Sequence, residues 1–285
     1  MSSTPFQALA CPLDGEPLEP LGSTWRCAVG HSFDIAKQGY VNLLPVQHKR
    51  SHDPGDSKAM VAARQRFLNG GYYDAIAAAV NRVVEEHRVV SGSPHAPYSC
   101  LDAGCGEGYY LRKLAGAVAG SSPLSLMGLD ISKWAVLAAA KQDMHQASWV
   151  VGSNAHLPVQ SAVLDCVLCM FGFPVAGEFA RVLKPGGLLL QVEAGPNHLR
   201  ELRELIYPTL KPERATEPSV PEGFAHRQTL SHCYSLVLEG AEKVADLLAM
   251  TPHLYRASAE GRARAAALDN ITLTVDVRLV VYTRV

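Results

Sequence analysis

The chain has 285 residues, of which 48% are hydrophobic and 19% charged, so it can bury a core and is not disordered by composition. Its formal net charge of −1 excludes a globally basic protein, so a nucleic-acid partner would have to bind a local basic patch. The sequence has no apolar run of 18 or more residues. Its first residues also lack the basic segment followed by an apolar segment that is typical of a signal peptide. These features predict a cytoplasmic protein without a membrane span or signal peptide.

Residues 1–44 are predicted to form a small β domain similar to a zinc ribbon. Its candidate metal ligands lie in two pairs near predicted hairpin tips: Cys11, Asp14, Cys27 and His31. Zinc accepts thiolate, imidazole and carboxylate ligands, and a domain this small needs a metal or another cross-link. The seven scattered cysteines also fit reduced thiols better than a disulfide framework. The alternative is a ribbon without metal, held by Trp25, Phe33 and Tyr40, with Asp14 in an ordinary turn.

A basic segment follows, within a predicted linker and helical region over residues 45–96. Between residues 47 and 66, five basic residues accompany two acidic ones, a net charge of +3. The basic residues are Lys49, Arg50, Lys58, Arg64 and Arg66. Because they flank Pro54-Gly55, a loop is expected to carry some of them and a helix from Ser57 the others. Such residues can bind RNA phosphates, although charge alone favours a solvated linker.

The segment 101–110, LDAGCGEGYY, is predicted as the end of a buried strand, a glycine loop and the first turn of a helix. Glycines at every second position, Gly104, Gly106 and Gly108, let the backbone approach a ligand closely. Their spacing departs from the G-x-G-x-x-G of dinucleotide-binding proteins. The carboxylate of Asp102 would repel a pyrophosphate but suits the ammonium of an amino-acid group. The loop therefore favours S-adenosylmethionine over NAD, and the alternative is a plain glycine turn.

Later segments agree with this interpretation. Asp130 ends the predicted strand LSLMGLD, 28 residues after Asp102, where a carboxylate can accept both ribose hydroxyls. Asn154 and Ala155 follow the strand-like SWVVGS, where an amide can hydrogen-bond an adenine edge. The apolar segments VLDCVLCMF and LLLQVEA, with the LKPGG turn before the second, are predicted as the fourth and fifth strands. RQTLSHCYSLVLEG and ITLTVDVRLVVYTR are predicted as the two closing strands.

These landmarks resemble the class I S-adenosylmethionine-dependent methyltransferases. Residues 97–285 are therefore expected to form an α/β Rossmann-like domain with a seven-stranded, mostly parallel sheet. The expected cofactor-binding residues are Asp102, Gly104, Gly106, Glu107, Gly108, Asp130, Ile131, Asn154 and Ala155.

The ribbon, the segment FDIAKQGYVNLLPVQHKRSHDPGDS and the loop CGEGYY together resemble the RlmA family of 23S rRNA guanine-N1 methyltransferases. The likeness covers nearly the whole chain. It implies an N-terminal zinc domain, a homodimer, and a target guanine in the loop of hairpin 35 of 23S rRNA. It also implies that Tyr73 and His198 contact S-adenosylmethionine and that the basic segment contacts RNA. Asp14 departs from the family's four-ligand metal pattern.

The chemistry leaves several roles open. His198, Glu193 and His156 lie near predicted strand ends and are candidates for the base that accepts the proton of guanine N1. Phe171 or Phe173 could stack on an extruded guanine or belong to the core. A small-molecule methyltransferase would share the fold without needing a ribbon and a basic linker. A non-catalytic RNA-binding protein would use the ribbon without needing the cofactor loop.

Overall fold

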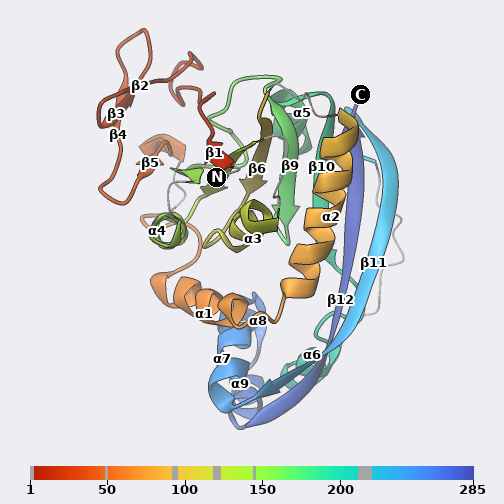
Figure 1. Ribbon diagram of the computed structural model, residues 1–285. Helices are drawn as coiled ribbons and strands as arrows, with labels where there is room; N and C mark the ends of the chain where they lie inside the picture. The colour runs from red at the N-terminus through yellow and green to blue at the C-terminus, as the bar shows by residue number, and fades with distance from the viewer. Residues whose placement is uncertain (1–2, 49–50, 92–95, 118–122, 144–145, 211–219) are drawn as a thin grey trace.

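A mixed, nine-stranded sheet forms the centre of the molecule (Figure 1). The computed structural model describes residues 3–48, 51–91, 96–117, 123–143, 146–210 and 220–285. The strands follow the order β11-β12-β10-β9-β6-β7-β8-β5, and β1 pairs with β7 beside this path. Five neighbouring strands are parallel: β6 (Tyr98–Ala103), β7 (Leu124–Asp130), β8 (Ala147–Val151), β9 (Leu164–Met170) and β10 (Leu183–Ala194).

The two closing strands are antiparallel to each other. They are β11 (Phe224–Glu239) and β12 (Asn270–Arg284), and β12 also pairs antiparallel with β10. All seven predicted strands are therefore present, and the α/β, mostly parallel architecture is confirmed. The order of these strands brings the ends of β6 and β7 together, which is where the predicted cofactor residues lie.

The N-terminal region makes a second, three-stranded antiparallel sheet from β2 (Glu19–Leu21), β3 (Thr24–Arg26) and β4 (Ser32–Asp34). Its flanking strands leave this small sheet and join the large one. β1 (Ser3–Pro5) pairs in parallel with β7, and β5 (Tyr40–Asn42) pairs in parallel with β8. Because β8 would otherwise present an unpaired edge, β5 satisfies backbone groups that a Rossmann-like domain leaves open. The sequence did not predict this pairing.

Helices cover both faces of the large sheet. They are η1 (Val46–His48), α1 (Lys58–Asn69), α2 (Asp74–Ser91), α3 (Tyr109–Ala117), α4 (Lys133–Gln142), α5 (Ala176–Val182), α6 (Arg200–Ile206), α7 (Ala241–Met250), α8 (His253–Arg256) and α9 (Ala259–Ala266). One buried cluster joins the sheet to α1, α2, α3, α4, α6 and α7, and a second joins its other face to α5 and the ribbon. Of the helices in the described ranges, none has the length and apolarity to cross a membrane.

The ring of Trp149, on β8, packs against both the glycine loop and β7. The ring is 3% exposed, and its Nε1 donates to Asp143 Oδ2 at 2.8 Å. A Cβ added at Gly128 would lie 2.3 Å from Trp149 Cζ3, and one at Gly108 would lie 2.5 Å from Trp149 Cη2. Both glycines are therefore needed where the ring packs between β7 and α3.

We expect Gly128→Ala to lower the free energy of unfolding by about 1–3 kcal/mol, because the added methyl overpacks a closed core. Gly116→Ala is the matched control, since a Cβ there meets nothing within 4 Å. That control should raise the free energy of unfolding by roughly 0.5–1 kcal/mol, because Gly116 lies in α3. Urea unfolding monitored by circular dichroism measures both. Equal stability of the two variants would contradict the packing of Trp149 described here.

Candidate functional site

Asp102 lies at the end of β6, directly before the glycine loop. The residue is 0% exposed, and neither of its carboxyl oxygens has a hydrogen-bond partner in the described structure. Burial, and then the nearby charge of Asp130, raise the pKa of Asp102 to about 8. A buried polar group without a partner is destabilising, so it indicates a ligand that supplies the missing donor.

Asp130 ends the neighbouring strand β7 and is held by backbone groups. Its Oδ2 accepts a hydrogen bond from the Gly106 N–H at 2.9 Å, and its Oδ1 accepts one from the Ser132 N–H at 2.8 Å. Burial raises the pKa of Asp130, while these two backbone donors oppose the rise. The half-buried Ile131 follows directly. Two carboxyl groups therefore meet at the ends of adjacent parallel strands, as the sequence predicts.

The glycine loop has an open side and a closed side. Gly104 has φ +93°, and a Cβ added there would meet nothing within 4 Å, so this part of the backbone is open to a ligand. Gly108 faces Trp149 instead, which gives this predicted cofactor residue a packing contact. Between them, Glu107 is 1% exposed. Its Oε2 pairs with Arg112 Nη2 at 2.8 Å, and its Oε1 has no partner in the described structure.

Asn154 adds another unpartnered acceptor on the next loop. Its Nδ2 donates to Ala103 O at 3.4 Å, while its buried Oδ1 has no partner within the described ranges. Ala155 beside it is exposed. The orphaned atoms of Asp102, Glu107 and Asn154 are all acceptors. They fit S-adenosylmethionine, which brings an ammonium, ribose hydroxyls and an adenine amine, and they do not fit a pyrophosphate.

An aromatic cluster lies beyond the loop. Tyr73 Oη and His198 Nε2 are 3.4 Å apart, and the ring of Phe171 stacks on His198 with centroids 5.7 Å apart. The Tyr73 and Phe171 centroids are 6.1 Å apart. Burial lowers the pKa of His198 to about 4. The two positions at which the family likeness predicts cofactor contacts are therefore adjacent, and Phe171 joins them.

The four predicted metal ligands come together at one end of the ribbon. Cys11 Sγ, Cys27 Sγ, His31 Nδ1 and an Asp14 oxygen all lie within 4.8 Å of one another. His31 Nδ1 is 2.8 Å from Asp14 Oδ2 and 3.5 Å from each sulfur. Donors at tetrahedral corners, about 2.0–2.3 Å from zinc, would be separated by roughly 3.3–3.8 Å. The His31–sulfur distances fit a zinc site, the Asp14 contacts are shorter than in one, and the donor types are those that zinc accepts.

The basic residues of the linker do not share one surface. Lys58 lies over the ring of Trp134, 5.9 Å from its centroid, and Arg66 pairs with Asp246 on α7. Arg64 points the other way, toward the glycine loop, and pairs with Asp56. Lys49 and Arg50 lie outside the described residues. The prediction that Arg64 contacts RNA stays a prediction; its side chain is 23% exposed and has partners within the fold.

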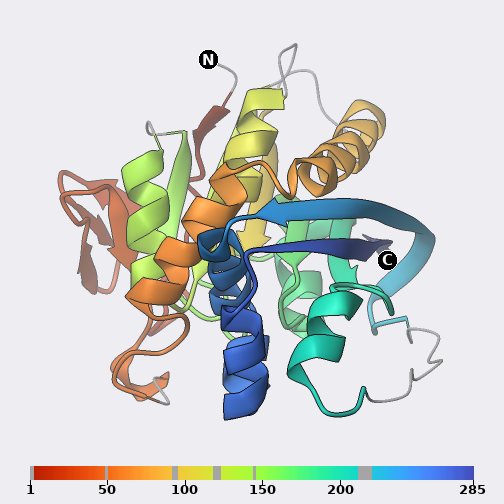
Figure 2. The same ribbon diagram turned by 90° about the horizontal axis from the view of Figure 1, so that it is seen from below.

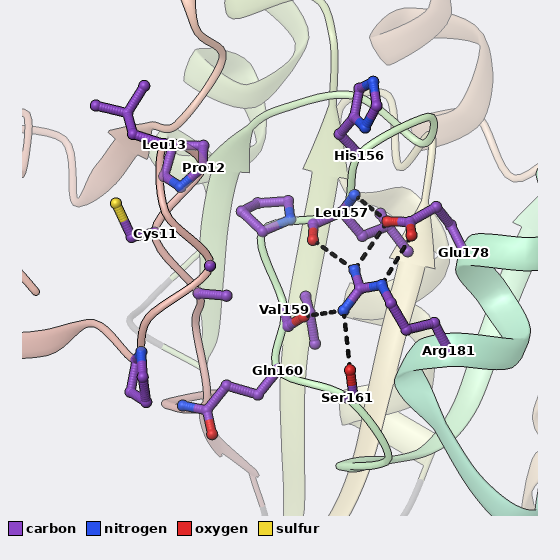
Figure 3. Close-up of a pocket in the computed structure, with 14 residues that line it drawn as sticks. Cys11, Pro12, Leu13, His156, Leu157, Val159, Gln160, Ser161, Glu178 and Arg181 are labelled. Atoms are coloured by element: carbon purple, nitrogen blue, oxygen red, sulfur yellow. Dashed lines mark hydrogen bonds and ion pairs between the residues drawn. The ribbon is translucent and has the colours of Figure 1, made fainter.

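A cavity of about 360 Å³ separates the ribbon from the loop before β9 (Figure 3). His156 and the ion pair of Glu178 with Arg181 line it. All five guanidinium donors of Arg181 are used, because they bind Glu178, Ser161 Oγ and the carbonyls of Val159 and Leu157. This cavity therefore offers a ligand little charge recognition, and no residue of the aromatic cluster is among those that line it.

Comparisons with known proteins match both parts of the chain. Residues 9–52 match the zinc-ribbon family described as RlmA, N-terminal, and residues 100–187 match a methyltransferase domain family. A provisionally named 23S rRNA (guanine-N(1)-)-methyltransferase of Micromonospora griseorubida is 35% identical over 96% of both chains. A Bacillus subtilis protein with the same provisional activity is 30% identical over 97% of both chains. A 23S rRNA (guanine(748)-N(1))-methyltransferase of Streptomyces fradiae is 36% identical over 70% of this chain and 67% of its own.

We expect the purified protein to contain about one zinc ion per chain, because the ribbon brings four possible zinc ligands within 4.8 Å of one another. Asp14→Ala should lose the metal and Asp14→Cys should keep it, as measured by mass spectrometry of the dissolved metal. Glu16→Ala is the control, since only the backbone N–H of Glu16 contacts Asp14. Full metal retention in Asp14→Ala would remove Asp14 from the ligand set.

The raised pKa of Asp102 predicts a pH-dependent affinity for S-adenosylmethionine. Below its pKa of about 8 the free carboxyl is mostly protonated, so it must lose a proton before it can pair with an ammonium. The affinity should therefore rise with pH between 6 and 8, by up to about tenfold per unit. Calorimetric titration of the wild type and Asp102→Asn tests this, and the variant should bind weakly without the rise. The control ligand is 5′-methylthioadenosine, which lacks the amino-acid group. A flat wild-type profile would contradict the prediction.

Proposed function

The chain belongs to the RlmA family of S-adenosylmethionine-dependent 23S rRNA (guanine-N1)-methyltransferases, and from this premise we propose that it methylates N1 of a guanine in the hairpin 35 loop of 23S rRNA. One observation carries the proposal. The unpartnered carboxyl of Asp102 lies beside a glycine loop, on a sheet whose other face packs against the ribbon. The same chain therefore combines a cofactor site and a candidate RNA-binding module in one core.

The protein's main task in such a reaction is orientation. S-adenosylmethionine supplies an activated methyl group, so the chain has to hold cofactor and guanine in line. Asp102 would hold the ammonium, Asp130 the ribose hydroxyls and Asn154 the adenine edge. Correct alignment of this kind can supply up to roughly 7–11 kcal/mol of the barrier.

Phe171 is the better of the two aromatic candidates for the target base. Its backbone is left-handed, with φ +53°, although it is neither glycine nor asparagine. That conformation costs of order 1–3 kcal/mol and persists where surrounding structure enforces it, often at functional sites. The ring is 39% exposed and packs against His198, whereas Phe173 is 87% exposed. We infer that a guanine stacks on the open face of Phe171.

The geometry also distinguishes His198 from Glu193 as candidate bases. His198 Nδ1 accepts a hydrogen bond from the Asp276 N–H at 3.3 Å, so its proton is on Nε2, which faces Tyr73. That arrangement makes His198 a neutral positioning group. Glu193, at the end of β10, keeps a partly exposed carboxylate 3.4 Å from Arg278. We therefore favour Glu193, or water, as the acceptor of the guanine N1 proton.

RNA binding and oligomeric state follow from the family likeness. The ribbon and Lys58 are the proposed RNA contacts among the described residues, and a homodimer is the proposed assembly. A small-molecule methyltransferase would not need a ribbon packed into its core. A non-catalytic RNA-binding protein would not need three orphaned acceptors around a glycine loop.

Incubation with labelled S-adenosylmethionine and 23S rRNA that lacks the modification tests the proposal. We expect label on one guanine of the hairpin 35 loop, located by mass mapping of nuclease fragments. Asp102→Ala should abolish labelling and cofactor binding while leaving RNA affinity within about threefold, because Asp102 is buried away from RNA. Labelling of a lipid or quinone extract would support the small-molecule alternative. RNA binding without any labelling would support the non-catalytic one.

A further inference from the structure

The predicted cofactor-binding residues leave one charged group of S-adenosylmethionine without a partner. The amino-acid end of the cofactor has an ammonium and a carboxylate. Asp102, Asp130 and Asn154 offer acceptors, which suit the ammonium, the ribose and the adenine. None of the nine loop and strand-end residues predicted to bind the cofactor is a cation, so a cationic side chain for the carboxylate has to come from elsewhere in the chain.

Arg64 brings a cation to the glycine loop. It lies on α1, which runs beside α7 near the carboxyl ends of the parallel strands (Figure 2). Its Cδ and Nη1 each lie 3.5 Å from where a Cβ of Gly106 would be. Its Nη1 pairs with Asp56, and its Nη2 donates to the Met250 carbonyl at 3.1 Å. The guanidinium is therefore fixed between three segments that are far apart in the sequence.

The loop that carries Asp56 is itself held by the residues that follow β7 and begin α4. The Ser132 hydroxyl donates to the Asp56 carbonyl at 2.7 Å, and Trp134 Nε1 donates to Asp53 Oδ2 at 2.7 Å. A Cβ at Gly55 would lie 2.9 Å from Ile131 Cγ2, so the loop packs directly on the residue that follows Asp130. This anchoring gives Arg64 a defined position before any ligand binds.

The charge around Arg64 is complementary to it. Burial raises the pKa of Glu107 and of Asp130, and the guanidinium of Arg64 is one of the groups that oppose this rise. A guanidinium has five donors in a rigid fork, and the Asp56 and Met250 contacts engage only part of that fork. The remaining donors suit a carboxylate, which guanidinium groups bind through paired hydrogen bonds.

We propose that Arg64 is a cofactor-binding residue whose guanidinium pairs with the carboxylate of S-adenosylmethionine, while Asp56 and the Met250 carbonyl hold the side chain over the glycine loop. This role replaces the phosphate contact expected from the sequence. It rests on the cofactor and not on the identity of the RNA, so it can be tested without any RNA substrate.

The test compares two ligands by calorimetry: S-adenosylhomocysteine and its decarboxylated analogue, which keeps the ammonium and lacks only the carboxylate. Arg64→Gln should raise the Kd of S-adenosylhomocysteine by roughly 10- to 100-fold, the usual range for a charge-assisted hydrogen-bonded pair. The Kd of the decarboxylated analogue should change by less than about threefold. Arg64→Lys should recover part of the affinity, because it keeps the charge without the fork.

Arg66→Gln is the matched control, since Arg66 lies on the same helix and pairs with Asp246. It should leave both Kd values unchanged, and thermal unfolding should show that all variants fold. An equal loss for both ligands in Arg64→Gln would overturn the proposal and assign Arg64 to holding the loop. No loss for either ligand would also overturn it.

If Arg64→Gln does not fold, the affinities of the wild-type protein for the two ligands still test the proposal. It should bind the carboxylate-bearing ligand at least about tenfold more tightly than the decarboxylated one, and equal affinities would overturn the proposal. In the methylation assay, Arg64→Lys should raise the KM for S-adenosylmethionine with kcat changed much less. A protein that binds the cofactor but labels no RNA would refute the proposed substrate and leave this measurement intact.

Discussion

A carboxyl group buried at the end of β6 governs the organisation of this protein. Asp102 is fully enclosed and has no partner among the described residues, an arrangement that costs stability unless a ligand completes it. The open backbone at Gly104, the second carboxyl at Asp130 and the cation at Arg64 are arranged around it. Under the two proposals, the strand ends offer carboxyl groups to the ammonium and the ribose of the cofactor, and α1 offers a guanidinium to its carboxylate.

Most of the catalytic fold was predictable because the parallel strands are short, apolar and separated by clear turns. The rule that ligands bind at strand ends then placed Asp102 and Asp130 together from two positions 28 residues apart. The clustering of Cys11, Asp14, Cys27 and His31 was predictable from spacing as well, since each pair lies near a turn. The contacts of Arg64 with Asp56 and the glycine loop were not predictable, because a count of charges cannot tell which face of a helix meets solvent.

Other features depend on tertiary contacts that leave no local pattern. The three-residue strands β1 and β5 have no usable periodicity. β5 pairs along the edge strand β8, and β1 pairs with the first residues of β7, up to Leu126, where the pairing with β8 begins. Phe171 and Phe173 are equivalent in the sequence. Only the left-handed backbone and the stacking on His198 distinguish them. The ion pair of Asp56 with Arg64 was not predictable either, because Arg64 lies two helical turns beyond the cap of α1.

The pairing of β5 with β8 has a mechanical consequence. An accessory module joined by a flexible linker samples many orientations, and restricting it to one orientation on binding costs entropy. Here the strands on both sides of the ribbon are hydrogen-bonded into the large sheet, so backbone pairing joins the ribbon to it at two places. Under the proposed function, this pairing would set the distance between the RNA segment bound by the ribbon and the guanine that receives the methyl group. That distance would then be fixed when the protein folds and not when it binds RNA.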